Sequence, residues 1–244
     1  MDWESEGYIV SVRKHGESSA IIDVLTPDQG RHAGLVRGGN SRRQRPVIEI
    51  GNKVQVQWRA RLSEHLGNFT IEPLQLNAAT LMHERTSLVG LNAVCAMART
   101  VLPERQAFPQ VYAAFDVLIE NMGDADIWPA LYVRWEMGVL AALGYGLDLS
   151  ACASTGANDN LTHVSPRSGR AVSASAAEPY LDKLLPLPPF MRGERGLSPQ
   201  DIHDGLNLTG FFLETRVQWG INQTLPEARA AMVERLLKER EYGD

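Results

Sequence analysis

The sequence predicts an α+β protein of two domains, a small β-barrel followed by an all-α domain. Segments of the first 80 residues alternate apolar and polar side chains with period two. From about Leu81 onward, apolar residues instead recur every three or four positions. The chain has 244 residues, of which 44% are hydrophobic, and this length allows one large domain or two small ones. The change of period along the chain favours two. We therefore expect a barrel domain over 1–80 and a helical domain over 81–244.

The clearest strand covers Lys53–Arg61. Its apolar residues, which include Val54 and Trp58, share one face, while the other face is polar. Turn-forming residues separate four further expected strands, at Tyr8–Val12, Ala20–Leu25, His32–Arg37 and Asn68–Ile71. Five short strands with no helical period between them favour a closed barrel, because closure removes exposed strand edges.

Helices are expected in the second domain from their period and their end signals. The segment Trp128–Leu143 carries Pro129 in its first turn and is followed by Gly144, which suits a left-handed cap. Two further helices are expected around Ser198–Leu213 and Leu225–Glu241. Residues 150–180 lack periodicity and are rich in Ser, Ala, Gly and Asn, so we expect an irregular connection there.

The common catalytic and membrane signatures are missing. None of the patterns GxxxxGK[ST], GxGxxG, HExxH or GxSxG occurs, and the six histidines are scattered singly. There is no apolar run of ~18 residues, and residues 1–6 are acidic, so we expect a protein that is neither exported nor membrane-spanning. Cys95 and Cys152 are expected to be free thiols. These absences favour a protein that is not an enzyme.

Positive charge is concentrated in one segment of an acidic chain. The whole chain carries a net charge of −5, whereas Gly30–Arg61 carries +7, with Glu49 as its single acid. Its basic residues are Arg31, Arg37, Arg42, Arg43, Arg45, Lys53, Arg59 and Arg61. Such a cluster is typical of a surface that binds a polyanion, because each neutralised phosphate releases condensed counterions. A solvated basic face without a ligand is the alternative, and charge alone does not decide between them.

Several separate motifs resemble the RecO family of bacterial recombination mediators. They are Gly16–Thr26, Gly30–Arg31, Val36–Arg43, Trp135–Glu136, Leu143–Gly146 and Leu149–Cys152, in the order in which the family has them. The resemblance implies an N-terminal OB-type barrel that binds nucleic acid, followed by a helical domain. It also implies binding to single- and double-stranded DNA, annealing of complementary strands, and a cytoplasmic, nucleoid-associated location. The implied partners are RecR, single-stranded-DNA-binding protein and, indirectly, the recombinase RecA.

The matching residues indicate where DNA would bind. The predicted phosphate ligands are Arg31, Arg37, Arg42, Arg43, Arg45 and Arg59. Most of them surround a Gly38–Ser41 turn, from which guanidinium groups can reach a flexible backbone. Trp58 and Phe69 are candidate stacking platforms, although the position of Trp58 on an apolar strand face favours a place in the core.

The resemblance also bears on metal and partner sites. Many relatives carry two CxxC pairs in the 150–180 region, where this chain keeps only Cys152. We therefore expect a zinc-finger-like segment without a full ligand set, and no metal or cofactor. Relatives receive the tail of single-stranded-DNA-binding protein in the helical domain, and Arg134 is the matching candidate. An RNA-binding barrel protein and a metal-dependent nucleic-acid enzyme are the alternative functions.

Overall fold

The computed structural model describes residues 1–195, 197–218 and 224–241. The chain divides into two compact units, unit 1 being Met1–Ala125 with Pro226–Met232, and unit 2 being Asp126–Leu225 with Val233–Asp244. The predicted α+β organisation, strands first and helices after, is confirmed. The first five strands end at Gln75 and the first helix begins at Asn77, and the compact unit that holds these strands continues to Ala125.

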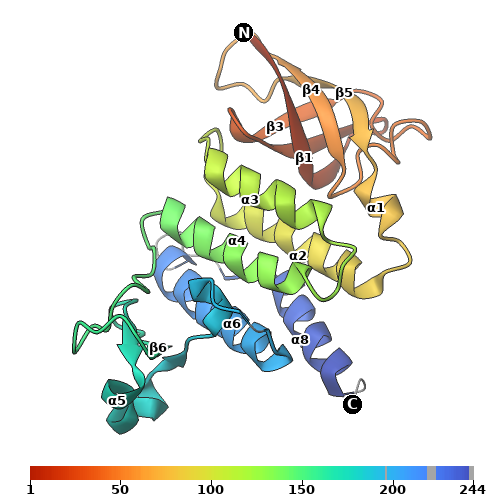
Figure 1. The fold of residues 1–244 in the computed structure, drawn as a ribbon. Coiled ribbons are helices and arrows are strands. Elements are labelled where there is room, and N and C mark those ends of the chain that lie inside the picture. The colour runs from red at the N-terminus through yellow and green to blue at the C-terminus, as the bar shows by residue number, and fades with distance from the viewer. Residues whose placement is uncertain (196, 219–223, 242–244) are drawn as a thin grey trace. The chain divides into compact units, whose positions relative to one another are not determined.

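Unit 1 begins with a closed five-stranded barrel (Figure 1). Its strands are β1 (Asp2–His15), β2 (Ser19–Thr26), β3 (Gly30–Val36), β4 (Lys53–Arg59) and β5 (Asn68–Gln75). The order β1-β2-β3-β5-β4 closes because β4 pairs back onto β1, which is the arrangement of an OB-type barrel. All five predicted strands are confirmed. Strand β1 starts earlier than expected, because Asp2–Gly7 pairs with β4.

Aliphatic and aromatic side chains fill the barrel. Its buried core includes Ile22, Val24, Val54, Val56, Trp58 and Phe69. The β3–β4 connection adds Ile48, which is also buried in this core. The period-two alternation of the strands therefore arises as the sequence predicts, with alternate side chains pointing into the barrel.

Unit 1 also contains three helices, α1 (Asn77–Thr80), α2 (Arg85–Val101) and α3 (Pro109–Glu120). Figure 1 shows α2 and α3 beside the barrel. Asp116 of α3 accepts hydrogen bonds from Tyr8 Oη at 2.6 Å and from Lys53 Nζ at 2.9 Å. Burial disfavours the Lys53 ammonium, but hydrogen bonds to Asp116 and Glu6 outweigh this and raise the pKa of Lys53. This polar cluster joins α3 to β1 and β4.

Unit 2 is mainly helical. It contains α4 (Trp128–Ala142), α6 (Pro199–Phe212), the π-helical turn η3 (Leu213–Gln218) and most of α8 (Glu227–Glu241). Helices α4, α6 and α8 lie where the sequence predicts helices, whereas η3 continues past the predicted end at Leu213. The buried carboxylate of Glu136 in α4 accepts a hydrogen bond from Thr209 Oγ1 in α6 at 2.5 Å. None of the helices in the described ranges is both long and apolar enough to cross a bilayer.

The prediction of an irregular 150–180 segment is wrong in part. The segment contains two strands, β6 (Leu161–Val164) and β7 (Ala171–Ser173), and these form a small sheet of order β7-β6-β8 with β8 (Leu185–Pro186), which follows the segment. Short helical turns α5 (Ala174–Ala177), η1 (Glu178–Lys183) and η2 (Pro189–Arg192) follow the strands or flank them. Alternation over three or four residues is too short for a sequence pattern to separate from a loop.

The zinc-finger-like description of this segment finds no support. The described residues contain no group of three or more His, Cys, Asp or Glu side chains that could hold a metal ion. Cys152 is buried, and its Sγ accepts hydrogen bonds from Ser173 N at 3.2 Å and Ser173 Oγ at 3.4 Å. Hydrogen bonds from Ser173 therefore satisfy the Cys152 sulfur.

Candidate nucleic-acid interface

The candidate interface centres on the long connection between β3 and β4, which covers residues 37–52. Asn40 holds its start, because Asn40 N bonds to Ser18 O at 3.0 Å and Asn40 Nδ2 bonds to Ser19 O at 3.0 Å. Ile48 holds its other end by insertion into the barrel core. The connection is thus fixed at two points, and the arginines between them are carried on a defined turn.

Arg42, Arg43 and Arg45 are exposed on this turn. The turn is closed by backbone hydrogen bonds, with Ser41 N donating to Gly38 O at 2.9 Å and Arg45 N to Ser41 O at 2.9 Å. Among the residues that the structure describes, no carboxylate lies within ion-pair distance of these three guanidinium groups. Three positive charges that are unpaired and solvated can bind an anion without first breaking an internal ion pair.

The β1–β2 hairpin adds two cations that sequence reasoning missed. Arg13 and Lys14 are exposed near the end of β1, where Lys14 pairs with Ala20. The bonds from Asn40 to Ser18 and Ser19 bring the arginine turn to the same hairpin. We call Arg13, Lys14, Arg37, Arg42, Arg43 and Arg45 together the basic rim. Only the sheet register could have revealed Arg13 and Lys14, because 23 or more residues separate them from the arginine cluster in sequence.

Arg37 and Arg59 continue the cationic surface along the barrel. Arg37 follows β3, and its Nε donates to Asn68 Oδ1 at 3.3 Å. Asn68 is in turn the register partner of Arg59 across β4 and β5. The Arg59 side chain is 82% exposed, and its Nη2 lies 3.8 Å from Asp2 Oδ2. An exposed pair at this distance is weak, so a phosphate can compete for Arg59.

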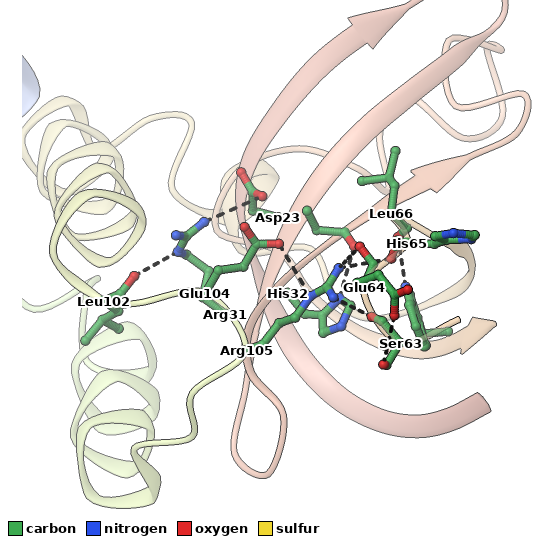
Figure 2. Close-up of polar contacts among 12 residues, drawn as sticks. Asp23, Arg31, His32, Ser63, Glu64, His65, Leu66, Leu102, Glu104 and Arg105 are labelled. Atoms are coloured by element: carbon green, nitrogen blue, oxygen red, sulfur yellow. Dashed lines mark hydrogen bonds and ion pairs between the residues drawn. The ribbon is translucent and has the colours of Figure 1, made fainter. Parts of the chain in front are cut away.

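Arg31 does not belong to this surface. Its side chain is only 16% exposed, its Nε donates to Leu102 O at 3.0 Å, and its Nη1 lies 3.8 Å from Asp23 Oδ1 (Figure 2). Arg99 Nε lies 3.6 Å from the second carboxylate oxygen of Asp23. The Arg31 guanidinium is engaged by its own protein, because the C-terminal end of α2 meets β2 and β3 at this point. We therefore leave Arg31 out of the proposed interface.

The two predicted stacking platforms are buried. Trp58 is 2% exposed and Phe69 4% exposed, and both belong to the barrel core. Trp58 Nε1 donates to Leu66 O at 3.0 Å, which fixes the indole. The placement of Trp58 in the core agrees with its position on the apolar strand face. Neither ring is open to a nucleobase.

Arg105 shapes the β4–β5 loop of the barrel. Its guanidinium donates to the carbonyl oxygens of Ser63, Glu64 and His65 (Figure 2), the last at 3.0 Å. Arg105 adopts φ 61°, a left-handed conformation that disfavours a side chain. The Arg105 side chain thus binds three carbonyl oxygens of an exposed loop. The backbone at Arg105 adopts a strained conformation that places the guanidinium beside this loop.

Replacing Arg105 by alanine should lower the free energy of unfolding by about 2 kcal/mol, because charge-assisted hydrogen bonds contribute about 1.5 to 3 kcal/mol. Arg105→Gly should be about 1 kcal/mol less destabilising than Arg105→Ala, because glycine relieves the left-handed backbone. Urea unfolding followed by circular dichroism measures both. Equal stability of the two variants would contradict the strain, and wild-type stability of both would contradict the loop contacts.

Arg134 lies in unit 2. It is exposed on α4, and its Nη2 donates to Phe190 O at 2.9 Å. One of its two terminal nitrogens is therefore engaged, while an Arg guanidinium offers five N–H donors in all. A carboxylate could bind the remaining donors, so Arg134 stays a prediction as a partner-binding residue.

Comparison with known proteins identifies the family. The model described as "Recombination protein O N terminal" matches residues 1–76, and "Recombination protein O C terminal" matches residues 82–224. The DNA repair protein RecO of Ruegeria sp. (strain TM1040) is 47% identical over 239 residues, which cover 98% of this chain and 99% of the relative. A RecO of Methylorubrum extorquens is 49% identical over 240 residues, covering 96% of this chain and 97% of the relative. That of Caulobacter vibrioides (strain NA1000) is 48% identical over 237 residues, covering 97% and 98%.

The resemblance seen in the sequence motifs is thus confirmed by matches along nearly the whole chain. The matched ranges cover most of both units, and both family descriptions name recombination. The chain belongs to the RecO family of DNA repair proteins.

Proposed function

We propose that this protein is a non-enzymatic recombination mediator that binds DNA strands through the basic rim and anneals them. The observation that carries the proposal is the set of exposed arginines at positions 42, 43 and 45, for which no ion-pair partner lies among the described residues. Phosphate binding at such a surface is blind to sequence, because guanidinium groups contact the backbone and not the base edges. Family membership favours DNA over the RNA-binding alternative.

Annealing follows from charge neutralisation. Two complementary strands repel each other through their phosphates, and cations bound along one strand reduce that repulsion. The rim carries six cations on a turn and a hairpin that hydrogen bonds hold together. A strand held at this edge leaves its bases free to pair, because the rim contacts only phosphates.

Two further parts of the proposal rest on the resemblance. We propose that unit 2 receives the acidic tail of single-stranded-DNA-binding protein, with Arg134 as one contact. We also propose that the protein acts with RecR, in the cytoplasm, to place the recombinase RecA on coated strands. The exposed guanidinium of Arg134 supports the first point, since it retains donors for a carboxylate.

The salt dependence of binding tests the contact model. If four to six rim cations each engage one phosphate, the logarithm of the association constant for a single-stranded oligonucleotide should fall with the logarithm of salt concentration. We expect a slope between about −3 and −4, from ~0.7 per contact. Fluorescence anisotropy with labelled oligonucleotides measures the slope, and annealing of complementary strands is followed in the same buffers. A slope near zero would contradict backbone binding, and binding without annealing would contradict the mediator role.

A further inference from the structure

The connection that carries Arg42, Arg43 and Arg45 ends at a buried asparagine, Asn52. Its exposed fraction is only 1%. Its backbone is fixed to β1, because Ile9 N donates a hydrogen bond to Asn52 O at 3.0 Å. A side chain on a backbone held in this way can fix the position of other parts of the chain.

The Asn52 amide binds the segment that directly follows Arg45. Its Nδ2 donates to Pro46 O at 2.9 Å and to Val47 O at 3.1 Å. Its Oδ1 accepts a hydrogen bond from Ala78 N of α1 at 3.1 Å. Both amide hydrogens are thus engaged with the connection, while the amide oxygen is engaged with a helix. The Asn52 side chain therefore joins the end of the arginine turn to α1.

Further hydrogen bonds lead from this point back to the arginines. Val47 N donates to Gln44 O at 2.9 Å, and Arg45 N donates to Ser41 O at 2.9 Å. Loss of the Asn52 side chain would remove the bonds that join the end of this turn to α1. A turn that moves more freely must lose that freedom when it binds a strand, and this cost weakens affinity.

We propose that Asn52 is a positioning residue, which holds the turn with Arg42, Arg43 and Arg45 in the conformation that binds phosphates. Asn52 is buried and contacts no phosphate itself, so it acts through the placement of the arginines. The inference rests on the proposed function, because the basic rim must be the site that holds the strand. It makes affinity depend on a buried, uncharged side chain, whereas the number of phosphate contacts does not depend on it.

The experiment measures binding of a labelled single-stranded oligonucleotide to Asn52→Ala by fluorescence anisotropy, at a temperature where urea unfolding shows the variant to be folded. Affinity should fall roughly ten-fold, a factor that corresponds to fixing the backbone of about one residue. The salt slope should stay at its wild-type value, because every arginine is still present.

Thr26→Ala is the matched control. Thr26 is also 1% exposed, and its Oγ1 closes the β2–β3 turn by donating to Gly30 O at 3.0 Å. That turn carries no residue of the basic rim. The control variant should therefore lose stability and keep wild-type affinity, whereas an equal loss of affinity in both variants would overturn the positioning role.

Combination with Arg42→Ala/Arg43→Ala/Arg45→Ala shows whether Asn52 acts through these arginines. In that background Asn52→Ala should change affinity by less than about two-fold, because the side chains that it positions are gone. A ten-fold loss both with and without the arginines would overturn the inference, as would wild-type affinity of Asn52→Ala alone. Wild-type affinity of the triple-alanine variant would instead overturn the rim, and with it the proposed function.

Hydrogen exchange of the wild-type protein keeps the test valid if Asn52→Ala does not fold. The backbone amides of Arg45, Val47 and Ile48 should be protected without DNA, and an added oligonucleotide should increase their protection only slightly. Amides that exchange freely in the unbound protein and become protected only with DNA would show a turn that forms on binding, and would overturn the proposal.

Discussion

Replacement of Asp23 by alanine should lower the free energy of unfolding by about 3 to 5 kcal/mol, the usual cost of removing one partner from a buried ion pair. The Asp23 side chain is 4% exposed and lies between Arg31 and Arg99, at 3.8 and 3.6 Å. Its removal leaves the Arg31 guanidinium, which is 16% exposed, without a counterion. Arg99 is 49% exposed and regains water, so Arg31 accounts for most of the cost. Urea unfolding followed by circular dichroism measures the effect.

Two further variants locate the cause. Asp23→Asn keeps the shape of the side chain and removes its charge, so it should recover only a small part of the lost stability. Asp28→Ala removes an exposed acid from the β2–β3 turn and should change stability by less than about 0.5 kcal/mol. A loss below about 1 kcal/mol in Asp23→Ala would show that the two arginines find other partners.

The ion pair of Asp23 also shows where sequence reasoning ends. Period-two alternation located all five strands, because burial inside a barrel forces alternate residues to be apolar. The same pattern does not predict which charged side chains form ion pairs with one another. In the sequence, Arg31 is one more cation of a basic segment. In the structure, its Nε donates a hydrogen bond to Leu102 O, 71 residues away along the chain. A contact of this kind depends on how α2 packs beside the barrel, and no local spacing encodes it.

The sequence predicts the arginines of the candidate interface, but it does not predict which other residues lie beside them. Arg42, Arg43 and Arg45 lie together because they are close in sequence and a short turn carries them. Lys14 joins them only through the pairing of β1 with β2 and the bonds of Asn40. Strand β1 begins at Asp2, ahead of the expected strand at 8–12, and the sequence pattern misses this start because the consecutive polar residues 4–6 interrupt the alternation there. Alternation is visible only where the outward residues differ from the inward ones by polarity and the strand is already recognised.

The joint replacement of Arg42, Arg43 and Arg45 by alanine should weaken binding to single-stranded oligonucleotides roughly 100-fold at about 50 mM salt. Each lost phosphate contact removes ~0.7 from the salt slope, so the slope should become shallower by about 2. Stability should stay within about 0.5 kcal/mol of wild type, because the three side chains are exposed. Fluorescence anisotropy over a series of salt concentrations measures affinity and slope together.

A second triple variant shows whether binding depends on where positive charge is removed or only on how much is removed. Arg85→Ala/Arg167→Ala/Arg195→Ala also removes three exposed arginines, so it changes the net charge equally and touches none of the basic rim. If DNA responds only to overall charge, both variants should weaken binding alike. If the rim holds the strand, the control should keep nearly all of its affinity and its salt slope.

Lysine at positions 42, 43 and 45 should restore most of the binding, because a phosphate accepts a compact ammonium as well as a planar guanidinium. Recovery by lysine, together with nearly wild-type affinity in the control variant, would attribute the binding to charge at this edge of the barrel. Loss of binding in both triple variants would move the DNA site elsewhere on the molecule.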